Sequence, residues 1–204
     1  MQGVKVSQSF SFIEKNSFFI LIVGLMMGGV LIGSIAFCGL SNDPVNKLSG
    51  ISQSFIETRA QQTPTDVFFD SLLSSTGQLF ALFLLGFWAL AQPIEIILPL
   101  LKGLGLGATL AEVYASAGIK GFFIILFLIL PFTLLSLFAL VIGTREAFRL
   151  SNIFAKKAFY DTNTTGMVGI TRLYFQKFII LEIIIIVASV VDALCSVLFS
   201  RFIQ

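Results

Sequence analysis

The chain of 204 residues contains no histidine, and only 12% of its residues are charged. Without histidine it lacks the commonest general base, the commonest zinc ligand and every serine–histidine nucleophile pair. It also lacks a glycine-rich turn followed by lysine and serine or threonine, the arrangement that holds a nucleotide phosphate. The sequence therefore argues against hydrolysis by these routes, and we expect no catalytic centre, cofactor, metal site or nucleic-acid partner.

Cysteine is scarce in this chain, whereas hydrophobic residues are abundant. The two cysteines, Cys38 and Cys195, fall near the ends of apolar runs, where free cysteine acts as a small packing residue rather than half of a disulfide. Hydrophobic residues make up 56% of the chain, 23 residues are phenylalanine, and the mean hydropathy is +0.97. These values exceed those of a soluble domain, so the sequence predicts an integral membrane protein.

The apolar runs predict an all-α, polytopic transmembrane helical bundle that forms a single membrane domain. Each run is long enough for a hydrocarbon core about 30 Å thick, which takes roughly 20 helical residues. The first run is too long and too weakly flanked for a cleaved signal peptide. Five crossings are expected, at about residues 17–38, 72–91, 94–117, 121–143 and 178–200.

The third crossing is exceptional because charges and a helix breaker interrupt it. It contains Glu95, Pro99, Lys102 and Glu112. A span that serves only as an anchor excludes such residues, since ions and unpaired backbone groups are costly in lipid. We therefore expect this segment to be buried against protein, either as a kinked crossing or as two half-helices that form a re-entrant segment.

Basic residues predict the orientation. Six lysines and arginines lie in segment 144–177, whereas the segment between the first two crossings has two against four acids. Segment 144–177 is therefore expected in the cytoplasm, and counting back places the N-terminus there too. Helix is expected to continue through Arg145–Arg149 and to turn at 161–166. The loop 41–71 is then external, with a short amphipathic helix around Ile51.

Pairs of glycines four residues apart occur three times. This spacing lets membrane helices approach closely, either within one bundle or between proteins, and we favour packing within the bundle. The pairs are Gly24 and Gly28, Gly29 and Gly33, and Gly103 and Gly107.

Acidic residues in the last crossing form a polar stripe. Glu182 and Asp192 lie with Ser189 along one side of that helix. One interpretation is a pathway for protons or an ion. The other interpretation, which we favour, is structural. The acids would then pair with Lys102 or with backbone groups freed near Pro99 and Pro131.

Lys102 directly precedes a glycine-rich run. A helix beginning there would place unsatisfied backbone amides beside a positive charge. Such a corner is suited to an anion or to the carboxylate of a partner.

The middle of the chain carries an ordered set of motifs that resembles a known family, the stage II sporulation protein M family. The resemblance covers about residues 68–151, whereas the first and last crossings agree only in hydrophobicity and position. Its residues are Phe69, Leu72 and Leu73, Leu85-Gly86, Pro93, Lys102-Gly103, Leu106-Gly107, Gly118-Ile119-Lys120-Gly121-Phe122, Leu130-Pro131 and Arg145-Glu146-Ala147-Phe148-Arg149-Leu150-Ser151.

The resemblance implies a non-catalytic scaffold in the bacterial cytoplasmic (inner) membrane. The family's named member anchors two peptidoglycan hydrolases, the stage II sporulation proteins D and P, while the mother cell engulfs the forespore. By this analogy the external loop 41–71 and the exposed faces of crossings one and three bind the partners' membrane anchors. A homo-oligomer is also compatible with the sequence.

A small transporter or channel for an ion or lipid-linked solute is the rival interpretation. It draws on the intramembrane charges and the interrupted third crossing. The absence of an evident internal repeat speaks against it, because inverted repeats are common in secondary transporters. The charges concerned are Glu95, Lys102, Glu112, Glu182 and Asp192.

Overall fold

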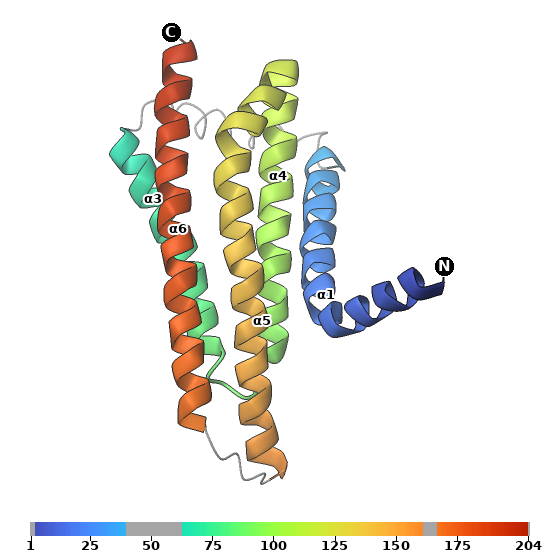
Figure 1. Cartoon of the computed structure of the whole chain (residues 1–204). Coiled ribbons are helices and arrows are strands. Elements are labelled where there is room, and N and C mark those ends of the chain that lie inside the picture. The colour runs from blue at the N-terminus through green and yellow to red at the C-terminus, as the bar shows by residue number, and fades with distance from the viewer. Residues whose placement is uncertain (1–2, 40–62, 161–166, 204) are drawn as a thin grey trace.

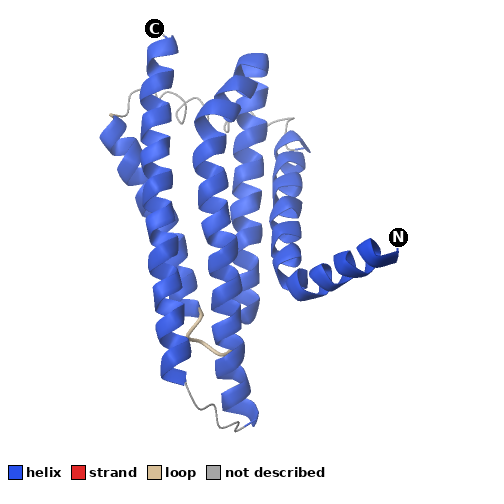
Figure 2. Ribbon diagram, viewed as in Figure 1, coloured by secondary structure: helices blue, strands red, loops and turns tan. Residues whose placement is uncertain are grey.

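The structure is a computed structural model that describes residues 3–39, 63–160 and 167–203 (Figure 1). Within these ranges the chain is helical apart from short turns, and five of its helices are long and apolar enough to cross a membrane (Figure 2). The predicted polytopic helical bundle is confirmed. Its elements are α1 (Gly3–Gly39), α3 (Pro64–Leu85), α4 (Gln92–Ile124), the π-helix η1 (Ile125–Ile129), α5 (Leu130–Tyr160) and α6 (Met167–Ile203).

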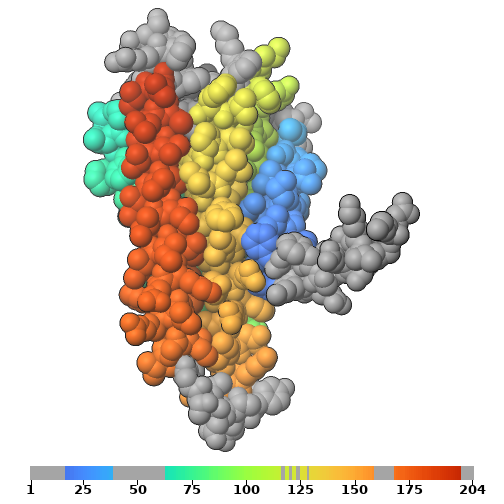
Figure 3. All heavy atoms as spheres, viewed as in Figure 1, coloured from blue at the N-terminus to red at the C-terminus, as the bar shows by residue number. Residues whose placement is uncertain are grey.

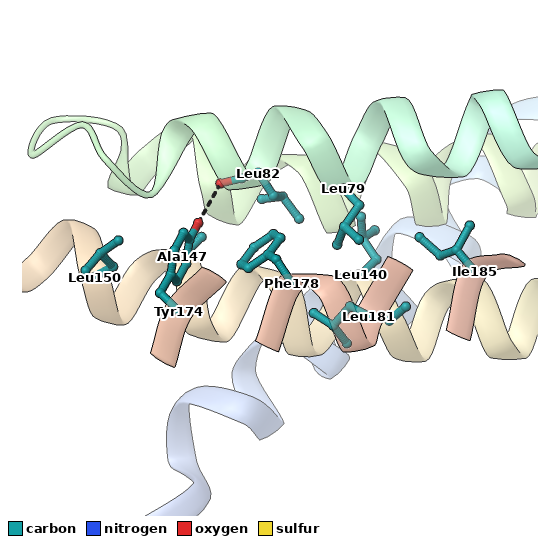
Figure 4. Packing of buried hydrophobic residues seen from close by; sticks show 10 residues of the cluster. Leu79, Leu82, Leu140, Ala147, Leu150, Tyr174, Phe178, Leu181 and Ile185 are labelled. Atoms are coloured by element: carbon teal, nitrogen blue, oxygen red, sulfur yellow. Dashed lines mark hydrogen bonds between the residues drawn. The ribbon is translucent and has the colours of Figure 1, made fainter. Parts of the chain in front are cut away.

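Helix α5 lies at the centre of the bundle. It packs against α3 and α6 on one side and against α4 and α1 on the other (Figures 1 and 3). The larger hydrophobic core joins α3, α5 and α6 through residues such as Leu82, Leu140 and Leu181, and a smaller one joins α1 to α5 (Figure 4). By contrast α3 and α4, which diverge from the turn that connects them, make few contacts with each other.

The first predicted crossing is confirmed, since its apolar window is Ser17–Cys38. The second begins at Pro64 rather than residue 72, because Thr63 and Asp66 form a capping box and Pro64 occupies the first turn. It ends at Leu85, not residue 91, where a turn begins. Residues 64–71 of the predicted external loop are therefore helical, whereas the amphipathic helix around Ile51 lies outside the described residues.

The third crossing is not split at Pro99. Helix α4 runs on from Gln92 with Pro93 in its first turn, where a missing N–H costs nothing, and Pro99 is buried against its neighbours. The non-helical residue of α4 is Gly118, with φ 55° and ψ −128°. The re-entrant alternative is therefore wrong, because a single apolar window spans Gln92–Ala115 before the chain turns.

The last two helices extend well beyond their predicted ends. Because Gly118 breaks α4, residues 121–124 lead through η1 into α5, as expected for a fourth crossing that starts at 121, but its apolar window Leu130–Ala158 ends well beyond residue 143. The fifth is Val168–Leu198 rather than 178–200. Most of the predicted cytoplasmic loop 144–177 is therefore helix, as expected for Arg145–Arg149, and the predicted turn at 161–166 lies outside the described residues.

An ion pair joins the two helices in this region. The Lys177 Nζ atom lies 2.7 Å from Oε2 of Glu146, which joins α6 to α5 beyond the predicted crossings. A hydropathy window ends at such charged residues, whereas a helix ends only where a cap or a helix breaker stops it.

Gly118→Ala tests the position of the helix break. A methyl group there meets no neighbouring atom, so the cost arises from the backbone conformation alone. We expect a loss of stability of about 1–3 kcal/mol. Thermal unfolding of the purified protein in detergent measures it. Gly77→Ala is the control, because this open glycine lies in the regular helix α3 and alanine there is expected to be neutral or stabilising.

Candidate functional site

Helices α1 and α4 approach each other at glycines. A methyl group on Gly29 would lie 2.5 Å from the carbonyl oxygen of Leu100. Methyl groups on Gly33, Gly103 and Gly107 would likewise overlap backbone carbonyls of the opposite helix. Because no side chain separates the two backbones here, these four glycines form the packing interface predicted for the bundle.

A hydroxyl group reinforces this glycine interface. Oγ of Ser34 lies 2.9 Å from the carbonyl oxygen of Val30 in its own helix and 3.0 Å from that of Gly107 in α4. It can therefore donate to either helix. Small residues and a hydroxyl are typical of close helix packing in membranes, where lipid offers no competing partner.

The remaining glycine pair has a different environment. A methyl group on Gly24 or Gly28 would meet nothing within 4 Å. The two glycines lie among exposed side chains of α1, such as Leu21, Met27 and Leu31. The prediction of packing within the bundle is therefore correct for four of the six glycines. Gly24 and Gly28 instead form a second small-residue face of α1 that the described chain leaves uncovered.

The acids of α6 are paired with hydroxyl groups of α3. Ser71 donates to Oδ2 of Asp192 at 2.6 Å, and Thr76 donates to Oε1 of Glu182 at 2.5 Å. Ser189 donates to the carbonyl of its own helix four residues back. The structural interpretation of this stripe is favoured, but Lys102 as its partner is wrong, because the described hydrogen bonds go to α3.

The turn between α3 and α4 is held by two more hydroxyl groups. Ser151 of α5 donates to the carbonyl of Trp88 at 2.8 Å. The Tyr174 hydroxyl of α6 lies 3.0 Å from the carbonyl oxygen of Phe83 and 3.3 Å from that of Leu82, the latter drawn in Figure 4. The Tyr174 hydroxyl thus reaches the Phe83 carbonyl near the end of α3, whereas the carbonyls of Leu82 and Trp88 also accept the backbone amides of Gly86 and Ala91.

Aromatic rings pack around the same turn. Phe83 stacks on Tyr174 with ring centroids 5.4 Å apart, and Phe178 lies 4.5 Å from Tyr174. Gly86 is required beneath this cluster, because a methyl group there would overlap the Tyr174 hydroxyl. The turn is therefore fixed to α5 and α6.

Glu95, in the first turns of α4, is completely buried. Within the described residues, neither of its carboxylate oxygens has a hydrogen-bond partner, and the same holds for Oε1 of Glu112. Burial without a partner is among the costliest arrangements for a carboxyl group. Neither residue joins the polar stripe of α6.

Lys102 lies in a cavity of about 600 Å³ between α3, α4 and the start of α5. Within the described part of the chain, no side chain pairs with its ammonium group. An unpaired lysine at the centre of a membrane helix costs about 2.5–3.5 kcal/mol on insertion scales. The cavity is lined by Ser74, Gln78, Leu98, Leu101, Lys102, Gly105, Leu106, Thr109, Ile129, Phe132, Thr133, Ser136 and Leu140.

The other predicted site residues lie apart from this cavity. Pro93 is exposed at the start of α4, Gly121 is buried near its end, and Pro131 is half-buried at the start of α5. The backbone of Lys120 lies in α4, and its side chain is outside the described residues. These residues do not meet in one place, so the residues that carry the resemblance do not form a compact centre.

The hydroxyl partners on α3 were not predicted from the sequence. A weak signal was present, because Ser71 and Ser75 lie four residues apart on one side of a helix, but Thr76 is not part of this pattern. Tyr174 and Ser151 each lie among other polar residues of their helices, so no pattern distinguishes them. Their roles depend on the turn that they contact.

Comparisons of the chain with protein-family models, with curated proteins and with solved structures found no match. The resemblance to the stage II sporulation protein M family therefore remains a prediction from the sequence motifs.

Gly107→Ala tests the contact between α1 and α4. The added methyl group would overlap the Val30 carbonyl, and overpacking of this kind costs about 1–3 kcal/mol. We expect a lower midpoint of thermal unfolding in detergent. Gly28→Ala is the matched control, since its methyl group enters open space. Equal unfolding midpoints for the two variants would contradict the described interface.

Proposed function

We propose that this protein is a non-catalytic membrane scaffold that binds the membrane segments of other proteins. Its partners in this proposal are the membrane-anchored peptidoglycan hydrolases, the stage II sporulation proteins D and P, that act during engulfment of a forespore. The partner class comes from the motif resemblance over residues 68–151. The mode of binding comes from the helix surfaces.

The uncovered face of α1 is the observation that carries the scaffold proposal. The helix uses Gly29 and Gly33 to contact α4, while Gly24 and Gly28 face open space on another side. Membrane helices associate where small residues let their backbones approach, because lipid supplies no hydrophobic drive. A helix with one glycine face occupied and a second one open is suited to binding a further helix.

The membrane and the orientation are part of the same proposal. The five apolar helices make this a multi-pass membrane protein. We place it in the bacterial cytoplasmic membrane with the N-terminus in the cytoplasm, since the basic residues gather at the end where α5 and α6 are joined. The external loop, which we expect to take part in binding, falls largely within residues 40–62, outside the described ranges.

Transport of a small anion is the second candidate, and the cavity around Lys102 is the observation that favours it. Midplane polar sites are typical of transporters. However, a pathway should connect the intramembrane charges, and Glu95, Glu112, Glu182 and Asp192 are not among the described residues that line this cavity. The scaffold is therefore the better supported proposal.

Gly28→Leu tests the docking face. The wild-type protein, tagged and purified in mild detergent from its native cells during starvation, is expected to retain peptidoglycan hydrolases that mass spectrometry identifies. The leucine side chain would block helix approach at an open position, so we expect at least about tenfold less hydrolase, the effect of losing roughly 1.4 kcal/mol of packing.

Gly77→Leu is the matched control, because this open glycine lies on α3. Both variants should reach the membrane in wild-type amounts. Hydrolases absent from the wild-type preparation would overturn the proposed function. If the Gly28→Leu variant retained as much hydrolase as the wild-type protein, the α1 face would not be the binding site. If only a second copy of this chain co-purified, the result would indicate a homo-oligomer instead.

A further inference from the structure

The cavity around Lys102 forms a groove between α3, α4 and the start of α5. We infer that this groove receives a membrane helix of a partner protein, and that an aspartate or glutamate near the middle of that helix pairs with the Lys102 ammonium group. The inference rests on the proposed scaffold function and names the chemistry of its partner. It comes from four features of the groove: its depth in the membrane, its unmatched charge, its side opening and its lining.

The turn between α3 and α4 sets the depth. Trp88 in this turn is 69% exposed, as is usual for tryptophan at a membrane boundary, and the turn contacts α5 between the exposed Arg145 and Ser151. Lys102 follows Gln92 by ten residues, or about 15 Å along the helix. This is about half of a 30 Å hydrocarbon core, so Lys102 lies near the membrane centre.

The polar residues on the other helices reach the same level. Gln78 and Ser74 precede Gly86 by eight and twelve residues, which places them about 12 and 18 Å from the turn. Ser136 precedes Ala147, which packs beneath that turn, by eleven residues, or about 16 Å. Polar groups from three helices therefore surround Lys102 at mid-membrane depth.

The charge of Lys102 is unmatched within the described chain. Thr76 and Ser71 donate to the carboxylates of Glu182 and Asp192, and Glu95 is buried outside the groove. A lysine at this depth requires an anion or water. A phospholipid phosphate lies at the membrane boundary, about 15 Å away, and does not reach it.

The groove opens sideways, toward lipid. Its lining residues Ser74, Leu101 and Gly105 are exposed, and α3 and α4 diverge above their turn with α5 between them (Figure 1). The occupant therefore enters from within the membrane, which suits a helix better than a water-borne solute.

The lining fits one face of a helix that carries a single acid. Gly105, one turn beyond Lys102, has open space where a side chain would be, so a neighbouring backbone can approach there. Leu101 and Phe132 supply apolar contacts. The Thr133 hydroxyl donates to a carbonyl of η1, and the Ser136 hydroxyl donates to a carbonyl of α5. Lys102 is therefore the one charged donor among the described lining residues, beside the neutral Ser74 and Gln78.

Photocrosslinking from Leu101, an exposed lining residue of the groove, in native membranes tests the inference. A photoreactive residue at this position is expected to crosslink a membrane segment of another protein, with an aspartate or glutamate within two turns of the attachment point. Adding Lys102→Met should reduce the yield about tenfold, the effect of losing one polar contact between membrane helices. Lys102→Arg should preserve the yield, and a photoreactive residue at the exposed Leu73 is the positional control.

The outcomes separate this inference from the scaffold proposal. Hydrolases that co-purify with the protein but give no crosslink from Leu101, or a yield unchanged by Lys102→Met, would overturn the groove as their site and leave the scaffold standing. A Lys102-dependent crosslink to an acidic helix of a protein other than a hydrolase would support the groove and contradict the proposed partners. Crosslinks to lipid or to a second copy alone would overturn the inference.

Discussion

The need to satisfy polar groups inside a membrane organises this structure. Lipid offers no hydrogen bonds, so each polar group at depth requires a partner from protein or water. The hydroxyls of Ser71 and Thr76 meet the acids of α6, and Tyr174 and Ser151 meet carbonyls of the turn between α3 and α4. These contacts fix the positions of α3, α5 and α6. The same need makes Lys102 informative, since no described residue meets it.

Hydropathy predicted the fold class and the crossing 17–38, because that part of α1 is a continuous apolar run. It misplaced the start of α3, where capping by Thr63 and Asp66 determines the first turn rather than the apolar content. The charges and Pro99 also left open a kinked crossing or two half-helices, whereas the break in α4 lies at Gly118. A buried proline is tolerated when packing holds the helix, whereas Gly118 adopts a positive φ that a proline cannot adopt.

The candidate site was predictable only in part. Glycine spacing identified the residues that join α1 to α4 but did not distinguish Gly28, which faces open space, from Gly29, which contacts α4. Adjacent residues on a helix lie about 100° apart, so the choice depends on where the partner helix stands. Likewise the sequence identified Lys102 as unusual, but its separation from the acids of α6 depends on the packing of α5 between α4 and α6.

The most direct test of the scaffold account is the access of water to the groove. Gly105→Cys, in a background without Cys38 and Cys195, can be exposed in native membranes to a charged, membrane-impermeant thiol reagent. The account predicts no labelling from either side, because the groove faces lipid and a partner helix at mid-membrane depth. Rapid labelling from one or both sides would contradict it and would indicate a water-filled pathway to Lys102, as a transporter requires.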